Sequence, residues 1–245
     1  MKTVLVTGCS SGFGLATATH FHDWGWRVIA TMRTPRPELL PASDRLRVLD
    51  LDVTDLQSVA ELVSAAGPID VLVNNAGIGV MGALEGLPME TARLVFETNV
   101  LGTMALTQAF LPQFRERRSG VIVNIGSIIA TKAFPLVSVY AASKAAIESF
   151  SASLALELRE FDIRVSLIQP GRSAETRFGE NARRLVTDGI PEAYAAFAQK
   201  VFAGMASSSA FTHPSDVAAA VWKAVHEPNS PLRIPAGADA IALTD

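Results

Sequence analysis

The sequence contains a single cysteine, Cys9, among its 245 residues. One cysteine excludes an intrachain disulfide and any zinc site built from several cysteines, and no other metal ligand set is predicted. This composition suits a reducing compartment, and we expect the protein in the cytoplasm. Charged residues make up only 18%, and the net charge is −3. Because no basic excess is present to attract phosphate backbones, we expect neither nucleic acid nor an anionic membrane as a partner.

Long hydrophobic runs are also missing. The N-terminal run Val4-Leu5-Val6 ends at Gly8 and is too short for the apolar region of a signal peptide. No apolar stretch is expected to be long enough to cross a bilayer. Linkers of low complexity and repeats are absent too, and 49% of the residues are apolar. A single dinucleotide-binding and catalytic domain over residues 1–245 is therefore predicted.

Short runs rich in Val, Leu and Ile alternate with longer segments of helical period. Several runs are apolar on both faces, as a parallel sheet covered by helices on each side requires. The alternation predicts a doubly wound, Rossmann-like α/β fold with three layers. The predicted strands are Thr3–Val6, Arg27–Thr31, Leu46–Leu51, Val71–Asn74, Val121–Ile125, Arg164–Ile168 and Leu232–Ile234. The predicted helices are Gly12–Trp24, Leu56–Ala66, Met89–Arg117, Val139–Phe161 and Ser215–Glu227.

Residues 172–212 interrupt this alternation. In sheets of this type the segments beyond the strand ends form the ligand crevice, so a long apolar segment there predicts a substrate-binding lid or helix pair. The alternative is that its apolar residues pack against the body of the domain. The residues concerned are Phe178, Tyr194, Phe197, Phe202, Met205 and Phe211.

A glycine-rich turn follows the first predicted strand directly. Gly8 permits a tight turn, Gly12 lets a pyrophosphate approach the backbone, and Gly14 allows close packing of helix and strand. The N-terminus of the next helix offers N–H groups and a positive dipole end to phosphates. The predicted cofactor contacts in the turn are Gly8, Ser10, Ser11, Gly12, Phe13 and Gly14.

The end of the second predicted strand lacks the carboxylate that usually holds the ribose 2′-hydroxyl of NAD. Arg33 stands there instead, where a guanidinium suits a 2′-phosphate, and Ser11 can add a hydroxyl donor. This exchange of an acid for a base favours NADP(H), although Arg33 can also be read as a solvated loop residue.

Polar and small residues also follow the third and fourth predicted strands. Asp52, followed by Val53, can accept from the adenine amino group or cap the helix that begins near Asp55. Asn75-Ala76-Gly77 lets a cofactor lie against the backbone, although turn formation also explains an Asn/Gly-rich segment.

The residues with the chemistry of a catalytic site follow. Tyr140 and Lys144 are four apart on a predicted helix and project from one face. A nearby ammonium lowers a tyrosine pKa and makes the phenol a usable acid/base at neutral pH. Ser127 lies just past the fifth predicted strand, and Asn99 lies inside a long helix, where Asn is unfavourable unless its side chain has a task. A turn hydroxyl and a helix-surface amide are the alternatives.

Taken together, these motifs resemble a classical short-chain dehydrogenase/reductase. The matching positions run from Thr7 through Asn75-Ala76-Gly77, Asn99, Ser127 and Tyr140-Ala141-Ala142-Ser143-Lys144 to Pro170-Gly171. They cover about the first 175 residues. Cys9-Ser10-Ser11 and Thr31-Met32-Arg33 further resemble the 17β-hydroxysteroid and retinol dehydrogenase branch.

The resemblance implies an NADP(H)-dependent carbonyl reductase or alcohol dehydrogenase. In the reductive direction Tyr140 would protonate the alkoxide that hydride transfer forms, and Ser127 would orient its oxygen. Lys144 would lower the Tyr140 pKa and hold the nicotinamide ribose, and Asn99 would anchor a water that links Lys144 to solvent.

One segment departs from the family's pattern. After Pro170-Gly171 the family usually has an apolar residue and a Thr four positions beyond the Gly, both touching the nicotinamide carboxamide. Here Arg172 follows Gly171, and Thr176 lies one position later. Either the loop bulges or Ser173 replaces part of the contact, so the predicted cofactor contacts here are Pro170, Gly171, Ser173 and Thr176.

Two other classes would use parts of this pattern. A catalytically silent NADP(H)-binding sensor would keep the fold but would not need Asn99, Ser127, Tyr140 and Lys144 together. A sugar-nucleotide epimerase would use the same Tyr/Lys pair, in a longer chain with a different glycine spacing.

The substrate and the assembly are predicted only in outline. Apolar residues near the site, Ile128, Ile129, Phe134 and Val137, predict an apolar ketone or alcohol, which a steroid, a retinoid, an aryl ketone or an acyl compound satisfies. Small residues at Ala141, Ala142, Ala145 and Ala146 permit close packing between subunits, and the resemblance implies a homodimer or homotetramer.

Overall fold

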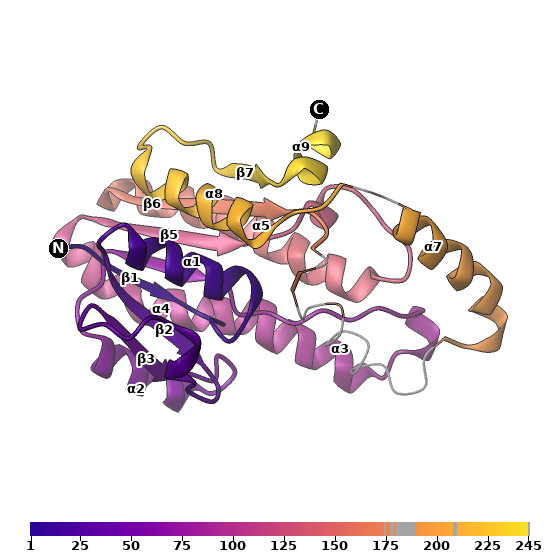
Figure 1. The fold of residues 1–245 in the computed structure, drawn as a ribbon, viewed down its shortest axis with the longest axis horizontal. Coiled ribbons are helices and arrows are strands. Elements are labelled where there is room, and N and C mark those ends of the chain that lie inside the picture. The colour runs from indigo at the N-terminus through magenta and orange to yellow at the C-terminus, as the bar shows by residue number, and fades with distance from the viewer. Residues whose placement is uncertain (174, 177–178, 180–189, 208–209, 245) are drawn as a thin grey trace.

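The computed structural model describes residues 1–173, 175–176, 179, 190–207 and 210–244. Seven parallel strands form one sheet in the order β3-β2-β1-β4-β5-β6-β7 (Figure 1). The chain order reverses between β1 and β4, which is where sheets of this type form a ligand crevice. The strands are β1 (Thr3–Val6), β2 (Arg27–Met32), β3 (Leu46–Asp50), β4 (Val71–Asn74), β5 (Gly120–Ile125), β6 (Ile163–Pro170) and β7 (Arg233–Ala236).

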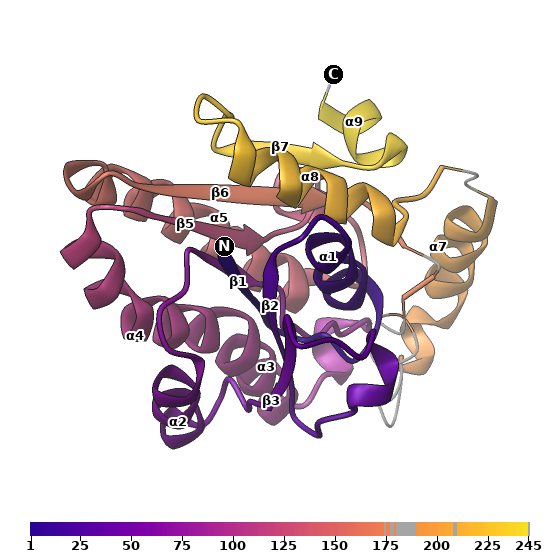
Figure 2. The same ribbon diagram turned by 60° about the vertical axis from the view of Figure 1, so that its left-hand side comes forward.

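Helices cover both faces of the sheet, and strand side chains alternate between them. In β1, Val4 and Val6 face a core shared with α1 (Gly12–Asp23) and α8 (Pro214–His226). Leu5 faces the opposite core, shared with α2 (Leu56–Ala66), α4 (Gly102–Arg117) and α5 (Ser138–Leu158). Figure 2 shows the sheet between these two layers. The predicted doubly wound, three-layer fold is confirmed.

Residues Met89–Arg117 form one helical stretch of 29 residues: α3 (Met89–Phe96), a turn of π-helix (Glu97–Leu101) and α4. The predicted range is confirmed. By length and composition this stretch could cross a membrane, so the prediction that no apolar stretch is long enough was wrong. In this fold the apolar residues of the stretch form part of the core, because Phe110 and Phe114 are fully buried against the sheet.

The C-terminal part of the chain contains elements that the pattern did not reveal. The predicted lid region contributes α7 (Ala195–Ser207), which extends beyond the C-terminal ends of the strands in Figure 1. One face of α7 packs through Ala198 and Val201 against Ala83 and Leu136. Phe197 and Phe202 are exposed, and Phe178 lies outside the described residues. A short helix α9 (Ala238–Thr244) follows β7 and was not predicted.

Candidate active site

The glycine-rich turn joins β1 to α1 at the crevice. Gly8 and Gly12 have φ of +72° and +58°, a conformation that L side chains rarely adopt. Ser11 is the N-cap residue of α1, and its hydroxyl makes no capping hydrogen bond. The Ser11 hydroxyl therefore leaves the N–H groups at the start of α1 uncapped, as an anion site requires.

Asn75 fastens this turn to the end of β4. Its side-chain amide donates to the carbonyls of Thr7 (2.7 Å) and Gly8 (3.3 Å), and the Thr7 hydroxyl accepts from the backbone of Asn75 and Ala76. The Asn75 side chain thus holds the walls of the predicted cofactor site together.

Gly14 is required by this same packing. A Cβ on Gly14 would lie 2.5 Å from the Gly8 carbonyl oxygen and 2.4 Å from the Asn75 amide. Because a backbone atom cannot yield, we expect Gly14→Ala to lower the free energy of unfolding by about 1–3 kcal/mol. Gly204→Ala in α7, where a Cβ would meet nothing within 4 Å, should leave stability unchanged or raise it by up to about 1 kcal/mol. Urea unfolding of both variants measures the difference, and equal effects would contradict this assignment.

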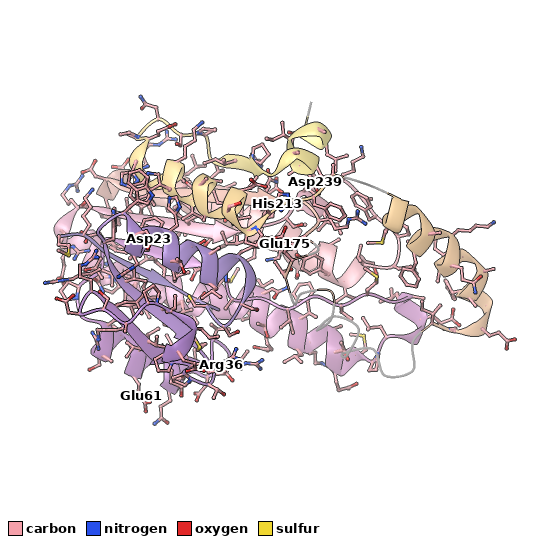
Figure 3. The ribbon with its side chains drawn as sticks, in the orientation of Figure 1. Asp23, Arg36, Glu61, Glu175, His213 and Asp239 are labelled. Atoms are coloured by element: carbon pink, nitrogen blue, oxygen red, sulfur yellow. The ribbon has the colours of Figure 1, made fainter. Side chains whose placement is uncertain are left out.

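Two arginines, Arg33 and Arg36, follow β2. Arg33 is exposed, and its charge helps to lower the pKa of Asp52. Arg36 donates from its guanidinium to the Ser10 carbonyl at 3.1 Å, which brings it to the glycine-rich turn (Figure 3). Arg36 was not predicted from the sequence, because only the contact with Ser10, which is 26 residues away in the chain, brings it to this turn. No carboxylate follows β2 before Glu38.

Three other predicted cofactor contacts, Asp52, Val53 and Phe13, make contacts within the protein. Asp52 accepts from the Thr54 backbone (2.9 Å) and hydroxyl (2.7 Å), which lowers the Asp52 pKa, and Asp55 caps α2 instead. The capping alternative for Asp52 was therefore wrong. The Val53 side chain is buried against Gly102, and that of Phe13 packs on the core next to α1.

Ser127 and Tyr140 meet beyond the C-terminal end of β5. Ser127 is buried, and its hydroxyl donates to the Pro170 carbonyl at 3.4 Å. Burial raises the pKa of Tyr140, and a hydrogen bond from Ser127 acts in the opposite direction. The Tyr140 phenol is therefore protonated at neutral pH, as a proton donor must be.

Lys144 lies one helical turn after Tyr140, and both residues belong to α5. Its Nζ is 5.8 Å from the centroid of the Tyr140 ring and donates to the Ile125 carbonyl at 2.8 Å. Burial lowers the pKa of Lys144 to about 8. The net shift of the Tyr140 pKa is upward and not downward as expected, because burial outweighs the groups that favour the phenolate.

The buried ammonium has a consequence for stability. The Lys144 pKa is about 8 in the folded protein and 10.5 ordinarily, so between these values the unfolded chain binds more protons. The free energy of unfolding should therefore rise with pH across this window, by about 3 kcal/mol in total. Lys144→Met should lack this rise and should be more stable than the wild type at pH 7. Urea unfolding of both proteins at several pH values provides the measurement; parallel pH curves would contradict it.

Asn99 lies in the π-helical turn and is 2% exposed. Its Oδ1 accepts from the Ile78 backbone (2.8 Å), and its Nδ2 donates to the Ile78 carbonyl (2.9 Å) and the Ser143 hydroxyl (3.0 Å). The π-turn thus links the segment after β4 to α5, and the surface-amide alternative for Asn99 was wrong. A Cβ on Gly77 would lie 3.2 Å from Asn99 Oδ1 and 3.7 Å from Lys144 Nζ, so this segment passes close to both side chains.

The segment after β6 reaches across to the glycine-rich turn. Thr176 lies against Gly12, where a Cβ would be 3.0 Å from the Thr176 methyl carbon. The buried Ser173 hydroxyl has no hydrogen-bond partner among the described residues. An unpartnered buried hydroxyl and a glycine cradle both fit a bound dinucleotide. The part of the chain that the structure describes holds no group of three His, Cys, Asp or Glu that could bind a metal.

The parallel sheet, the glycine-rich turn and the Ser127–Tyr140–Lys144 group define a doubly wound nucleotide-binding oxidoreductase. A family model described as short chain dehydrogenase matches residues 2–186. The chain belongs to this family of dehydrogenases and reductases, which act on CH–OH groups with a nicotinamide cofactor.

Curated relatives place the chain within the family. It is 37% identical over 241 residues to 3-ketodihydrosphingosine reductase of Bacteroides thetaiotaomicron, covering 96% of this chain and 88% of that protein. It is 36% identical over 257 residues to bovine retinol dehydrogenase 8, with 95% and 80% covered. Human 17-beta-hydroxysteroid dehydrogenase type 1 is 39% identical over 183 residues, with 69% and 56% covered. The predicted likeness to this branch is confirmed.

Solved structures with bound cofactor are also similar. A closed serine dehydrogenase complexed with NADP+ superposes with a TM-score of 0.81 and 31% identity, covering 95% of this chain and 93% of that one. A short-chain dehydrogenase from Burkholderia phymatum in complex with NAD gives a TM-score of 0.81 and 25% identity, with 96% and 88% covered. Both cofactors therefore occur among the structural relatives.

Proposed function

We propose that this protein is an NADP(H)-dependent carbonyl reductase acting on an apolar ketone, with Tyr140 as the proton donor. The observation that carries the proposal is the meeting of Ser127, Tyr140 and Lys144 at the C-terminal edge of the sheet. Asn99 stabilises this group by donating to Ser143, which lies in α5 with Tyr140 and Lys144. A hydroxyl pair and a buried ammonium together provide an acid and the means to stabilise its conjugate base.

The proton chemistry follows from these positions. When bound, NADPH supplies a hydride to the carbonyl carbon. Tyr140 donates its phenolic proton to the resulting alkoxide oxygen, and Ser127 donates a hydrogen bond to that oxygen. Tyr140 is left as a phenolate, whose negative charge the Lys144 ammonium stabilises. A proton from water then restores the phenol.

The protonation state of Tyr140 supports the reductive direction. Burial raises the Tyr140 pKa, so the resting enzyme holds the proton that reduction consumes. Oxidation of an alcohol would need the phenolate instead, and we expect it to require higher pH.

Two arginines support NADP(H) over NAD(H). Arg36 is fixed on the glycine-rich turn, Arg33 lies nearby at the end of β2, and the usual carboxylate is missing. Guanidinium groups suit the 2′-phosphate, which NAD(H) lacks. The proposal names Arg33, Arg36 and the Ser11 hydroxyl as its ligands.

An apolar substrate is supported by the residues around the catalytic group. Ile128 follows Ser127 in the chain, Val137 shortly precedes Tyr140, and both are buried. Phe134 lies between them in the chain and is exposed. Relatives named for a keto compound and for retinol also favour an apolar carbonyl or alcohol. We further propose that the protein is cytoplasmic. We also propose that it forms a homodimer or homotetramer, and sedimentation of the purified protein would test this assembly.

The test is consumption of NADPH and NADH by the purified protein with aryl methyl ketones, long-chain ketones and aldehydes. We expect oxidation of NADPH with the apolar ketones and slower oxidation of NADH. Tight NADPH binding without consumption would favour a sensor. Bound NAD that turns over internally would favour an epimerase. Equal use of NADH would overturn the cofactor assignment.

A further inference from the structure

The C-terminal end of β6 is joined to α9 through four residues, Gly171, Arg172, Thr212 and Asp239, which we call the β6–α9 junction. The Asp239 carboxylate accepts from the Arg172 backbone N–H at 2.6 Å and lies 2.7 Å from the Thr212 hydroxyl. That hydroxyl accepts from the Gly171 N–H at 2.9 Å, and the Thr212 N–H donates to the Arg172 carbonyl at 2.8 Å. Figure 3 shows Asp239 on α9, close to His213 at the start of α8.

Two glycines make this close approach possible. A Cβ on Gly171 would overlap the Asp239 carboxylate, and a Cβ on Gly237 would overlap the Thr212 side chain. Gly237 also has a φ of +94°. Because Thr212 is only 1% exposed, its hydrogen bonds form out of water, where losing one partner is costly. The junction is thus a tightly packed polar contact.

Arg172 carries the junction to α7. Its guanidinium donates to the Met205 carbonyl in α7 and lies 4.5 Å from the centroid of the Phe211 ring. Nearer its N-terminus, α7 packs on Ala83 and Leu136, and Leu136 shortly precedes Tyr140 in the chain. The Arg172 side chain therefore connects the end of β6 to the helix that lies beyond the strand ends.

We propose that the β6–α9 junction positions α7 over the substrate, with Thr212 and Asp239 as positioning residues and Arg172 as the link. The inference rests on the proposed function, because the substrate is taken to lie between α7 and Tyr140. Since none of the four residues donates the proton, loss of the junction should weaken substrate binding far more than the chemical step.

The variants are Thr212→Val, which removes the hydroxyl at constant shape, and Thr212→Ser, which keeps it. Arg172→Leu removes the guanidinium and leaves the junction backbone in place. For Thr212→Val and Arg172→Leu we expect about a tenfold higher KM for the panel ketone that the wild type reduces fastest, with kcat changed less than about threefold. Amide exchange in α7 should become about tenfold faster. Thr212→Ser should behave as the wild type.

Binding of 2′,5′-ADP provides the control, because it reports the distant adenosine end and should be unchanged in all variants. Unchanged exchange in α7, or an unchanged KM, in folded Thr212→Val and Arg172→Leu would overturn the inference. If Thr212→Val fails to fold, Arg172→Leu alone decides. A wild type that consumes no NADPH would overturn the proposed function instead, and amide exchange would still test the link between the junction and α7.

Discussion

Replacing Tyr140 with Phe is expected to lower kcat for ketone reduction by about 10²–10⁴-fold, the usual contribution of general acid catalysis. The substitution removes only the hydroxyl, and the proposed mechanism has no other group that donates the proton to the alkoxide. Steady-state kinetics with NADPH and single-turnover measurements provide the test.

Binding distinguishes this loss from a damaged fold. The phenyl ring of the variant fills the same space as the Tyr140 ring and is uncharged, as the protonated phenol is. The NADPH Kd should therefore change by less than about threefold. Lys144→Met should give weaker NADPH binding together with slower turnover, because the proposal places Lys144 at the nicotinamide ribose. Retention of turnover within a few-fold in Tyr140→Phe would remove this residue from its assigned role.

The fold could be predicted from the sequence because strands and helices leave different periodic signals. The range Met89–Arg117 was predicted to the residue, and the apolar runs gave β1 and β4 with their bounds. The π-helical turn in the middle of the long stretch leaves no such signal, since its residues remain helical in pattern. The short helix α9 was missed for a related reason: seven residues do not establish a helical period.

The site could be predicted where the residues leave a local pattern in the sequence. Tyr140 and Lys144 share a helix face by spacing alone, and the glycine pattern marks the turn after β1. Arg36 and Asp239 were not predictable in this way. Their positions depend on contacts with Ser10 and Thr212, which lie 26 and 27 residues away in the chain. Only the folded chain shows that a loop arginine and a C-terminal carboxylate lie at the site.

Replacing both Arg33 and Arg36 with Ala should raise the NADPH Kd by about 100-fold or more, while the NADH Kd changes by less than about threefold. Each charge-assisted hydrogen bond to the 2′-phosphate contributes about 1.5–3 kcal/mol, and NADH has no group to lose. Of the two single variants, Arg36→Ala should have the larger effect. Its guanidinium is already held on the Ser10 carbonyl, so less side-chain entropy is lost on binding.

A matched control separates this local contact from the general loss of positive charge. Arg93 is an exposed arginine on α3, paired with Glu90 at 3.1 Å, and Arg93→Ala should leave both dissociation constants unchanged. Raising the salt concentration should weaken NADPH binding to the wild type more than to the double variant, because screening acts on the charges that the variant lacks. Fluorescence titration with each cofactor gives the dissociation constants of the wild type and of every variant. Equal weakening of NADPH and NADH would show that the arginines support the turn and do not read the 2′-phosphate, and the cofactor assignment would then fail.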